Sequence, residues 1–489
     1  MVPTFPLGLK PLGCRRFMGL SVFNTLSRSV EPFVPLDPEG KKVGLYCCGP
    51  TVHDFAHIGN FRTFVFADIV RRYLDFKGFK VRHVMNITDV EDKIIRRVNE
   101  SNKSLKEYTR EYEEAFFNDL EALGCLMPDD QPHATDFIGP IIKLIKKLEE
   151  RGIAYRTNDG SVYFSIENYR KGGNSYGQLL NLNLDEMRPG ERVSSDEYEK
   201  ESVADFALWK SRVTEDGEVF WNSPWGEGRP GWHIECSAMS MELLGPSFDL
   251  HLGGEDLVFP HHEDEIAQSE GACLQCDGQK FVKYWMHGSH LLVEGKKMSK
   301  SLGNFFTLRD LLAKGFDGRA VRYLMISAHY RETFNFTLDN LRGAKTALGR
   351  IDECTSKLRE LSAEKIVSPD NDSKLVNDFI KAMDDDLNVS AAWAAVFDWV
   401  RNINRQLAAE EIDNSTAAIE LANWEQINKV LGIQTTEEKP PAEILALAEE
   451  RQAARKNKDF QLSDKIRDEL LEKGWTIEDT PKGPRVKLN

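Results

Sequence analysis

Apolar residues in the first hundred positions alternate between strand-like runs and helical spacing. Residues 43–48 (VGLYCC) form a short apolar run that ends at Gly49-Pro50, which predicts a buried strand. Residues 61–77 carry apolar side chains at helical spacing, and residues 81–85 form a second strand-like run. This strand-helix-strand order predicts a parallel sheet with a right-handed crossover.

The rest of the chain changes pattern several times. In chain order, the predictions are amphipathic helices at 104–123 and 138–152, an irregular stretch with short strands at about 154–225, strands at 248–252 and 290–293, and helices from 308 to about 431. The sequence TTEEKPP, residues 435–441, predicts a linker. After it we expect two helices that end near 458 and 473, and two short strands near 475–477 and 485–488.

We therefore expect an α/β fold. Its catalytic domain would be a Rossmann-type, doubly wound parallel sheet with an inserted subdomain, followed by a helical bundle and a small α+β C-terminal domain. The expected boundaries are an extension at 1–20 that could be disordered, the sheet domain at 21–330 with its insertion at about 125–225, the helical domain at 331–434, and the C-terminal domain at 442–489.

Composition restricts the class of protein. A chain of 489 residues is too long for one core, so about two to four domains are expected. Hydrophobic residues make up 41%, which fits a globular protein, and no apolar stretch approaches the roughly 18 residues needed to cross a membrane. The net charge of −15 argues against wholesale coating of nucleic acid, but it allows a local basic surface.

Cysteine spacing and the N-terminus bear on localisation. The eight cysteines show no framework spacing, which indicates reduced thiols in a cytoplasmic chain. The first thirty residues contain several basic side chains and no acid before Glu31, and an organellar transit peptide can have this composition. The alternatives are an over-extended start, with Met18 the true first residue, or a harmless tail. We expect a cytoplasmic protein, with a transit peptide as the minor alternative.

Two polar segments follow strand-like runs at distant places in the chain. The HIGN segment, residues 57–60, offers imidazole and amide groups beside a glycine, where a phosphate could approach the backbone. The KMSKS segment, residues 297–301, offers two lysines and two hydroxyls. Together, such groups could bind ATP and neutralise the negative charge of its phosphates while a phosphoanhydride bond is split. Either segment alone is a weak indication, since Lys and Ser are common in solvated loops.

A candidate metal set consists of Cys48, Cys236, His261 and Glu265. Pro260 favours a helix start that places positions 261 and 265 one turn apart on one face. Two thiolates, an imidazole and a carboxylate form a plausible zinc set. Sequence spacing does not bring the four together, and a small core cysteine and a polar helix cap are the simpler interpretations. Cys273 and Cys276 form a rival pair with metal or redox spacing.

Five blocks of sequence follow one another in a specific order. They are CCGPTVHD leading into HIGN (47–60), NITDVEDK (86–93), GRPGWHIECSAM (228–239), FPHHEDE (259–265) and KMSKSLGN (297–304). In this order they resemble the cysteinyl-tRNA synthetase family of class I aminoacyl-tRNA synthetases, from about Leu20 to the C-terminus. One departure is Asn60, where many class I enzymes have a second His. An amide can still donate a hydrogen bond to a phosphate oxygen.

This resemblance implies an activity and a metal. L-cysteine would be activated with ATP to cysteinyl-adenylate and transferred to the 3′-terminal adenosine of tRNA(Cys). The family's zinc ligands correspond to Cys48, Cys236, His261 and Glu265, which leaves the pair Cys273 and Cys276 outside the site. One zinc ion per chain would select the substrate thiol over the hydroxyl of serine, and Mg²⁺ would accompany ATP.

The resemblance also suggests residue roles. We expect His57 and Asn60 to stabilise charge near the α-phosphate, and Lys297 and Lys300 to contact the β- and γ-phosphates. Further expected contacts are Gly59, Gly254 and Asp256 with ATP, and Thr88 and Trp232 with the substrate cysteine. The simpler interpretations are a turn for Gly254 and core packing for Trp232.

The C-terminal unit is expected to contact the anticodon of tRNA(Cys). Residues 451–489 contain ten basic and seven acidic residues, a local basic bias that suits phosphate contact. Trp475 could stack on a base, but we favour a place in the small core. We expect a monomer. Two alternatives are a relative that passes cysteine to a small amine without tRNA, and a non-catalytic descendant that would have lost His57, Lys300 or a zinc ligand.

Overall fold

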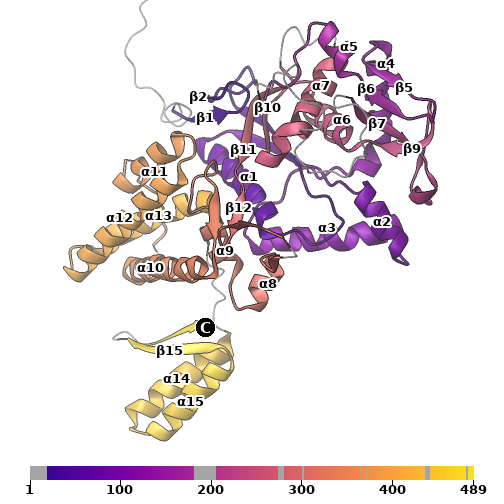
Figure 1. Ribbon diagram of the computed structural model, residues 1–489. Helices are drawn as coiled ribbons and strands as arrows, with labels where there is room; N and C mark the ends of the chain where they lie inside the picture. The colour runs from indigo at the N-terminus through magenta and orange to yellow at the C-terminus, as the bar shows by residue number, and fades with distance from the viewer. Residues whose placement is uncertain are drawn as a thin grey trace, which may run out of the picture. The chain divides into compact units, whose positions relative to one another are not determined.

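The computed structural model describes residues 19–180, 205–273, 280–299, 302–363, 365–370, 372–434, 441–480 and 483–488 (Figure 1). The chain divides into two units, Met1–Ile433 and Gln434–Asn489. Residues 1–18 of the expected extension and residues 435–440 of the expected linker lie outside the described residues. Within the described part of the chain, no helix is both long enough and apolar enough to cross a membrane.

Four parallel strands form the sheet that the sequence predicts, in the order β11-β10-β3-β4. Their bounds are Lys42–Cys47 for β3, Lys80–Met85 for β4, Phe248–Gly254 for β10 and Val282–Gly288 for β11. Leu45 of β3 pairs with His83 of β4 on one side and with Leu250 of β10 on the other. Segments far apart in the chain thus lie side by side. Across the sheet, the sequence order of the strands changes direction between β3 and β10.

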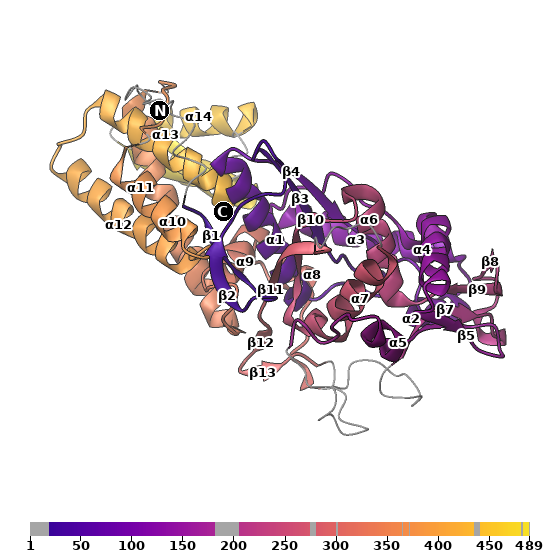
Figure 2. The same cartoon turned by 90° about the horizontal axis from the view of Figure 1, so that it is seen from above.

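Helices cover both faces of this sheet, as a doubly wound fold requires (Figure 2). They are α1 (Ile58–Lys77) on one face, and α6 (Trp232–Leu244) and α7 (Glu263–Ala272) on the other. Leu45 and Leu250 pack in the core that contains α1, whereas Tyr46 and Trp285 pack in the core beneath α6 and α7. Adjacent residues of β3 serve different cores because side chains alternate along a strand.

The stretch that we expected to be irregular forms a five-stranded antiparallel sheet, in the order β5-β6-β7-β9-β8. Its strands are β5 (Ala154–Arg156), β6 (Val162–Phe164), β7 (Phe206–Ser211), β8 (Trp221–Ser223) and β9 (Gly226–Pro230). Phe164 and Trp209 are fully buried in its core. The short strands expected in this stretch are present. Strands of three to six residues are too short for a distinctive alternation, which is why the sequence pattern did not locate each of them or show that they pair into one sheet.

Three helices connect the parallel sheet to this antiparallel sheet, and one more lies within it. They are α2 (Asp92–Glu100), α3 (Leu105–Ala122), α4 (Ile138–Glu150) and α5 (Ile166–Lys171). The predicted helices at 104–123 and 138–152 are confirmed as α3 and α4. Ser104 caps α3 by accepting a hydrogen bond from Glu107 N, and the carboxylate of Glu107 accepts one from Ser104 N in return.

Beyond the parallel sheet the chain is mainly helical. The elements are β12 (Leu291–Val293), β13 (Lys296–Lys297), α8 (Leu308–Ala313), α9 (Gly318–Met325), β14 (Phe334–Phe336), α10 (Leu338–Ser362), α11 (Lys374–Asp384), α12 (Val389–Ala408) and α13 (Asn414–Leu431), with an N-terminal hairpin of β1 (Ser21–Asn24) and β2 (Ser29–Pro32). The expectation of uninterrupted helix from 308 onward was wrong at β14. Phe334 and Phe336 are buried there because β14 pairs in parallel with β12.

The second unit contains α14 (Ala442–Lys456), α15 (Phe460–Glu472), β15 (Trp475–Thr480) and β16 (Gly483–Leu488). The two strands pair antiparallel from Trp475↔Leu488 to Thr480↔Gly483. Trp475 is 5% exposed and packs with Ile444, Ile466 and Leu470. The preferred interpretation of Trp475 as a core residue is therefore confirmed.

A buried ion-pair network joins α1 to α9 and to the end of α13. Asp68 accepts hydrogen bonds from Arg322, at 2.5 Å, and from Arg72, at 2.7 Å. Arg322 is 0% exposed and also donates to the carbonyl of Leu431, and Arg72 donates to the carbonyl of Lys429. Because Arg322 has no access to water, its charge depends on Asp68 for compensation.

We predict that Asp68→Ala destabilises the first unit. Removing one partner of a buried ion pair typically costs about 3–5 kcal/mol, because it leaves the other charge uncompensated. The midpoint of urea unfolding, followed by circular dichroism, measures the effect. The control is Asp398→Ala, which removes an ion pair with Arg401 whose side chains are 64% and 77% exposed, and which should change the midpoint little. Equal effects of the two substitutions would contradict the prediction.

Candidate active site

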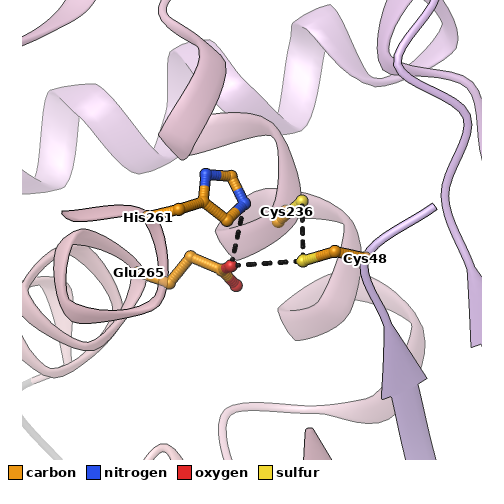
Figure 3. A group of neighbouring side chains, drawn as sticks. All are labelled: Cys48, Cys236, His261 and Glu265. Atoms are coloured by element: carbon orange, nitrogen blue, oxygen red, sulfur yellow. Dashed lines mark hydrogen bonds and ion pairs between the residues drawn. The ribbon is translucent and has the colours of Figure 1, made fainter. Parts of the chain in front are cut away.

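The four predicted metal ligands converge at one edge of the parallel sheet. Cys48 follows β3, Cys236 lies on α6, and His261 and Glu265 lie just before and on α7 (Figure 3). Their ligand atoms all lie within 4.8 Å of one another, and all four residues are buried. The Sγ atoms of Cys48 and Cys236 are 3.8 Å apart, and Nε2 of His261 is 3.2 Å from Oε1 of Glu265. We call this group the Cys-His-Glu cluster; its composition suits a metal ion.

The helix that carries two of these residues differs slightly from the predicted one. α7 begins at Glu263, and the segment before it, Val258–His262, is kinked at Phe259, whose backbone is extended. His261 and Glu265 still face each other across this junction. Of the rival pair, Cys273 follows α7 directly, and Cys276 lies outside the described residues.

Proton positions in the Cys-His-Glu cluster follow from its hydrogen bonds. The thiol of Cys48 donates to Cys236, which lowers the pKa of Cys236 to about 6, whereas burial raises the pKa of Cys48 well above its usual value. Burial opposes ionisation of Glu265, but His251 and His261 outweigh it and lower the pKa of Glu265 to about 2. Burial lowers the pKa of His261, but contacts with Cys236 and Glu265 outweigh it and raise this pKa to about 10. Two anions thus lie beside protons on Cys48 and His261. A divalent cation would displace these protons, because metal ligands must be deprotonated.

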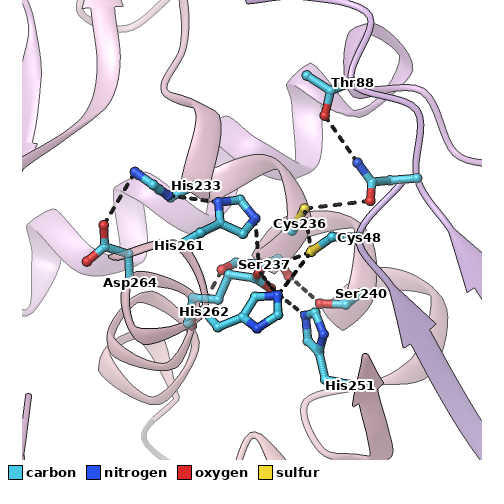
Figure 4. A network of polar contacts seen from close by, with 12 residues as sticks. Cys48, Thr88, His233, Cys236, Ser237, Ser240, His251, His261, His262 and Asp264 are labelled. Carbon is cyan, nitrogen blue, oxygen red and sulfur yellow. Dashed lines mark hydrogen bonds and ion pairs between the residues drawn. The ribbon is translucent and has the colours of Figure 1, made fainter. Parts of the chain in front are cut away.

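A layer of buried histidines lies beneath this cluster, and our sequence analysis did not identify it (Figure 4). His251 Nε2 is 2.9 Å from Oε2 of Glu265, and His262 Nε2 is 3.4 Å from Sγ of Cys48. Cys48, His251, His262 and Glu265 therefore form a second possible metal group that shares two residues with the first. The motif FPHHEDE contains His262, but no sequence pattern connects it with His251 of β10.

Two further histidine contacts extend the network. His262 Nδ1 is 2.7 Å from Nε2 of His287, and His233 Nδ1 is 2.8 Å from Nδ1 of His261. Burial lowers the pKa of His262 well below its usual value and that of His287 to about 3, so both imidazoles are neutral at pH 7. Neutral imidazoles can ligate a metal or hold a ligand in place by a hydrogen bond.

The predicted cysteine-pocket residues both lie beside the Cys-His-Glu cluster. The ring of Trp232 is 4.2 Å from that of His261, centroid to centroid. Thr88 accepts a hydrogen bond from Asn86, whose side-chain oxygen lies 3.7 Å from Sγ of Cys236 and accepts a hydrogen bond from Gly49 N. Asn86 is a site residue that our sequence analysis did not single out, although it opens the block NITDVEDK.

The HIGN segment forms the N-terminus of α1. His57 is the N-cap residue: its Nδ1 accepts a hydrogen bond from Asn60 N at 3.2 Å, and Asn60 Oδ1 accepts one from His57 N at 3.1 Å. Since Nδ1 is an acceptor, the proton of the neutral imidazole lies on Nε2. Burial lowers the pKa of His57, which keeps it neutral. The positive end of the helix dipole lies at the same place and favours an anion.

The HIGN and KMSKS segments meet in space. A Cβ on Gly59 would lie 2.7 Å from Cε of Met298, so the methionine side chain packs directly on this glycine. Downstream of the KMSKS segment, Phe306 O accepts a hydrogen bond from Ile58 N at 3.0 Å. Lys297 is an exposed residue of β13, while Lys300 and Ser301 lie outside the described residues.

The predicted adenosine residues lie at the end of β10. Gly254 is the last residue of β10, and a Cβ there would be 2.3 Å from Oδ1 of Asp256 and 3.6 Å from Oγ1 of Thr63 on α1. A side chain would therefore fill the space between Asp256 and α1. The carboxyl ends of β3 and β10, where the strand order changes direction, are where such sheets bind nucleotides.

Comparison with known proteins identifies the class. The family model "tRNA synthetases class I (C) catalytic domain" matches residues 33–346, and the DALR domain model matches residues 378–435. Two solved structures show the same fold. Mycobacterium tuberculosis methionyl-tRNA synthetase matches 80% of this chain and 90% of its own, with a TM-score of 0.55 and 13% sequence identity. The LeuRS of Agrobacterium radiobacter K84 matches 82% of this chain and 85% of its own, with a TM-score of 0.58 and 11% sequence identity. The catalytic-domain match places the chain in class I of the aminoacyl-tRNA synthetases.

Two curated relatives narrow this class to one family. The cysteine–tRNA ligase of Chlamydia muridarum (strain MoPn / Nigg) is 47% identical over 485 residues, which cover 96% of this chain and 100% of the relative. That of Protochlamydia amoebophila (strain UWE25) is 45% identical over 478 residues, which cover 96% and 98%. The chain belongs to the cysteine–tRNA ligase family, as the five sequence blocks predicted.

The two overlapping metal groups lead to a prediction. We expect the group with His261 to bind the ion, so His261→Ala should lower the affinity for Zn²⁺ more than His251→Ala. Loss of a residue that only supports a ligand typically costs roughly 10- to 100-fold in metal affinity, and loss of a ligand should cost at least as much. Competition with a zinc-binding dye measures both affinities. A larger loss in His251→Ala would instead favour the second group.

Proposed function

We propose that the chain activates L-cysteine with ATP to cysteinyl-adenylate and then transfers cysteine to the 3′-terminal adenosine of tRNA(Cys). The observation that carries this proposal is the common location of the Cys-His-Glu cluster and the HIGN segment. Cys48 and His57 both follow β3, so a group selective for sulfur and a group suited to phosphate lie on one loop. A substrate with a thiol and a carboxylate could contact both.

We infer that the Cys-His-Glu cluster holds one Zn²⁺, with Cys48, Cys236, His261 and Glu265 as ligands. Two sulfurs, one nitrogen and one oxygen are donors that zinc accepts. Bound zinc would take the substrate thiolate as a further ligand, a bond that the hydroxyl of serine makes poorly at neutral pH. His233 and His251 would hold two of the ligands in place, and Thr88 and Trp232 would contact the rest of the amino acid.

In the activation step, a carboxylate oxygen of cysteine attacks the α-phosphorus and pyrophosphate leaves. His57 would donate its Nε2 proton as a hydrogen bond to an α-phosphate oxygen. Asn60 would donate from its amide nitrogen, since its amide oxygen is used in the helix cap. Lys297 and Lys300 would neutralise the leaving pyrophosphate, and Gly59, Gly254 and Asp256 would line the ATP site. We expect Mg²⁺ to accompany ATP.

The transfer to tRNA separates this proposal from its nearest alternative. A ligase that passes cysteine to a small amine would need no tRNA-binding end. This chain aligns with 100% of the length of a cysteine–tRNA ligase, and it includes the unit of α14, α15, β15 and β16. The basic bias of residues 451–489 supports anticodon contact by this unit. His57, Lys300 and all four proposed ligands are present, which argues against a non-catalytic descendant. A monomer in the cytoplasm remains our prediction.

The contact between the HIGN and KMSKS segments gives a sharp test. Gly59→Ala would place a methyl group against Met298 and the ring of His57, and so displace groups that we assign to ATP. Misplacement by about 1 Å can cost roughly 100-fold in rate. The contact with Met298 involves the end of a flexible side chain and the His57 ring needs to shift by less than about 1 Å, so we expect a smaller loss, of about 3- to 10-fold, in cysteine-dependent ATP–pyrophosphate exchange. Gly343→Ala is the control, since the added carbon there has no described atom within 4 Å other than those of its chain neighbours and of the surrounding backbone of α10. Full exchange activity of Gly59→Ala would contradict our assignment of the segment.

Substrate selection by zinc is tested by comparing cysteine with serine. The purified protein should exchange pyrophosphate with cysteine and charge tRNA(Cys), and serine should support neither reaction. Cys236→Ser should weaken cysteine affinity most and ATP affinity least. Metal analysis should find about one zinc ion per chain. Exchange without charging would favour the amine ligase, whereas a zinc-free active protein or full cysteine affinity of Cys236→Ser would contradict the zinc proposal.

A further inference from the structure

Phe55 is an exposed aromatic residue two positions before the HIGN segment. It is 37% exposed, although the neighbouring Val52 and Ile58 are buried. The loop that carries it is held in place: Tyr108 of α3 donates a hydrogen bond to His53 O at 2.9 Å, and Phe55 N donates to Asp54 Oδ1 at 2.8 Å. Phe55 is therefore an exposed residue in a loop that is held in place, close to the proposed reaction centre.

Side chains from two helices flank the ring of Phe55 and leave part of it accessible. Tyr112 of α3 contacts it edge-on, with centroids 5.2 Å apart, and the guanidinium of Arg309 on α8 lies 5.2 Å from its centroid. Arg309 is itself 44% exposed and is held by Asp119 at 3.4 Å and by Ala115 O at 3.1 Å. We call Phe55, Tyr112 and Arg309 the Phe55 platform; α3 and α8 are labelled in Figure 1.

The chemistry of this platform suits a nucleobase. Unpaired bases stack on aromatic rings and on guanidinium planes, and such stacking tolerates any base because every base has a π-face. A basic stretch lies nearby: residues 93–106 contain five basic residues and one acidic residue in a chain of net charge −15. Ile94 and Val98 of this stretch pack with Val52 and Tyr108, beside the loop that carries Phe55. Two of these basic side chains form ion pairs in this structure, Arg97 with Glu100 and Lys103 with Glu111, so the phosphates that follow a stacked base would compete with these carboxylates for the positive charge.

We propose that the Phe55 platform stacks an unpaired base at the 3′ end of tRNA during the transfer step. This inference rests on the proposed function, because the terminal ribose must reach the adenylate beside His57. Two residues span at most about 7 Å of chain, so Phe55 is close to that centre. The platform gives the single-stranded end a fixed place without selecting a particular base, and it has no part in activating cysteine.

The experiment compares Phe55→Leu with Phe55→Tyr. Leucine keeps an apolar side chain but loses the π-face, whereas tyrosine keeps the ring. Phe55→Leu should retain wild-type ATP–pyrophosphate exchange and lose roughly 5- to 150-fold in kcat/KM for tRNA, which corresponds to about 1–3 kcal/mol for one stacked base. Phe55→Tyr should retain near wild-type charging. Melting temperatures of both variants check that the fold is intact.

A binding measurement tests the contact itself. Wild-type protein should bind full-length tRNA more tightly than tRNA that lacks its last two nucleotides, and Phe55→Leu should bind the two equally. Unchanged charging by Phe55→Leu, or an equal loss of exchange and charging, would overturn the platform while leaving the proposed function in place. Wild-type protein that exchanges pyrophosphate but never charges tRNA would refute the transfer activity, and with it this inference.

Discussion

The parallel pairing of β10 with β3 is the interaction on which the whole site depends. It joins segments about two hundred residues apart in the chain, at Leu45↔Leu250. Since parallel strands end at the same edge of a sheet, the residues that follow β3 and those that follow β10 must meet. Cys48 and the HIGN segment come from the first strand, and Gly254, His261 and Glu265 come from the second. The group that we propose for sulfur and the group that we propose for phosphate therefore share one edge because of strand order.

The interior of this edge is unusually polar. His251, His262 and Glu265 are each 0% exposed and lie where other sheets of this kind have apolar side chains. Burying such groups costs stability unless every polar atom finds a partner. Here imidazoles, thiols and a carboxylate hydrogen-bond to one another, although Nδ1 of His251 is buried without a hydrogen-bond partner among the described residues. Such an arrangement costs folding free energy and gains a site with fixed donors, which is the usual compromise at functional sites.

Much of this architecture could be predicted because its signals are local. The strand at 43–48, the helix at 61–77 and the strand at 81–85 correspond to β3, α1 and β4, although α1 begins three residues earlier, at Ile58. That start was missed because the cap uses a histidine and an asparagine instead of the common Ser, Thr or Asp. The four residues of the Cys-His-Glu cluster were a candidate metal set from their chemistry alone, and the family resemblance made them an expectation, because their spacing in the sequence does not bring them together.

Other features depend on contacts that no local pattern encodes. The three-residue strands β5, β6 and β8 are stabilised by pairing within their sheet, and β14 exists because β12 is beside it. His251 and His262 come together only through the packing of α7 on the sheet. Their places in the sequence, one in a buried strand and one in a helical turn, resemble those of ordinary core residues. Both the formation of the short strands and the assembly of the second metal group therefore depend on tertiary contacts.

The end of α13 has a consequence for how this protein could be divided. Carbonyls of Lys429, Leu431 and Ile433 accept hydrogen bonds from Arg72, Arg322 and Arg319, which belong to helices α1 and α9. The helical region is thus hydrogen-bonded to α1, the helix that begins at the HIGN segment. A fragment cut before α10 would leave Arg322 without the carbonyl of Leu431, and would expose the apolar surface that α13 covers. A cut or an insertion beyond Ile433 should therefore disturb the first unit less than one within the helical region, whose end is hydrogen-bonded to α1 and α9.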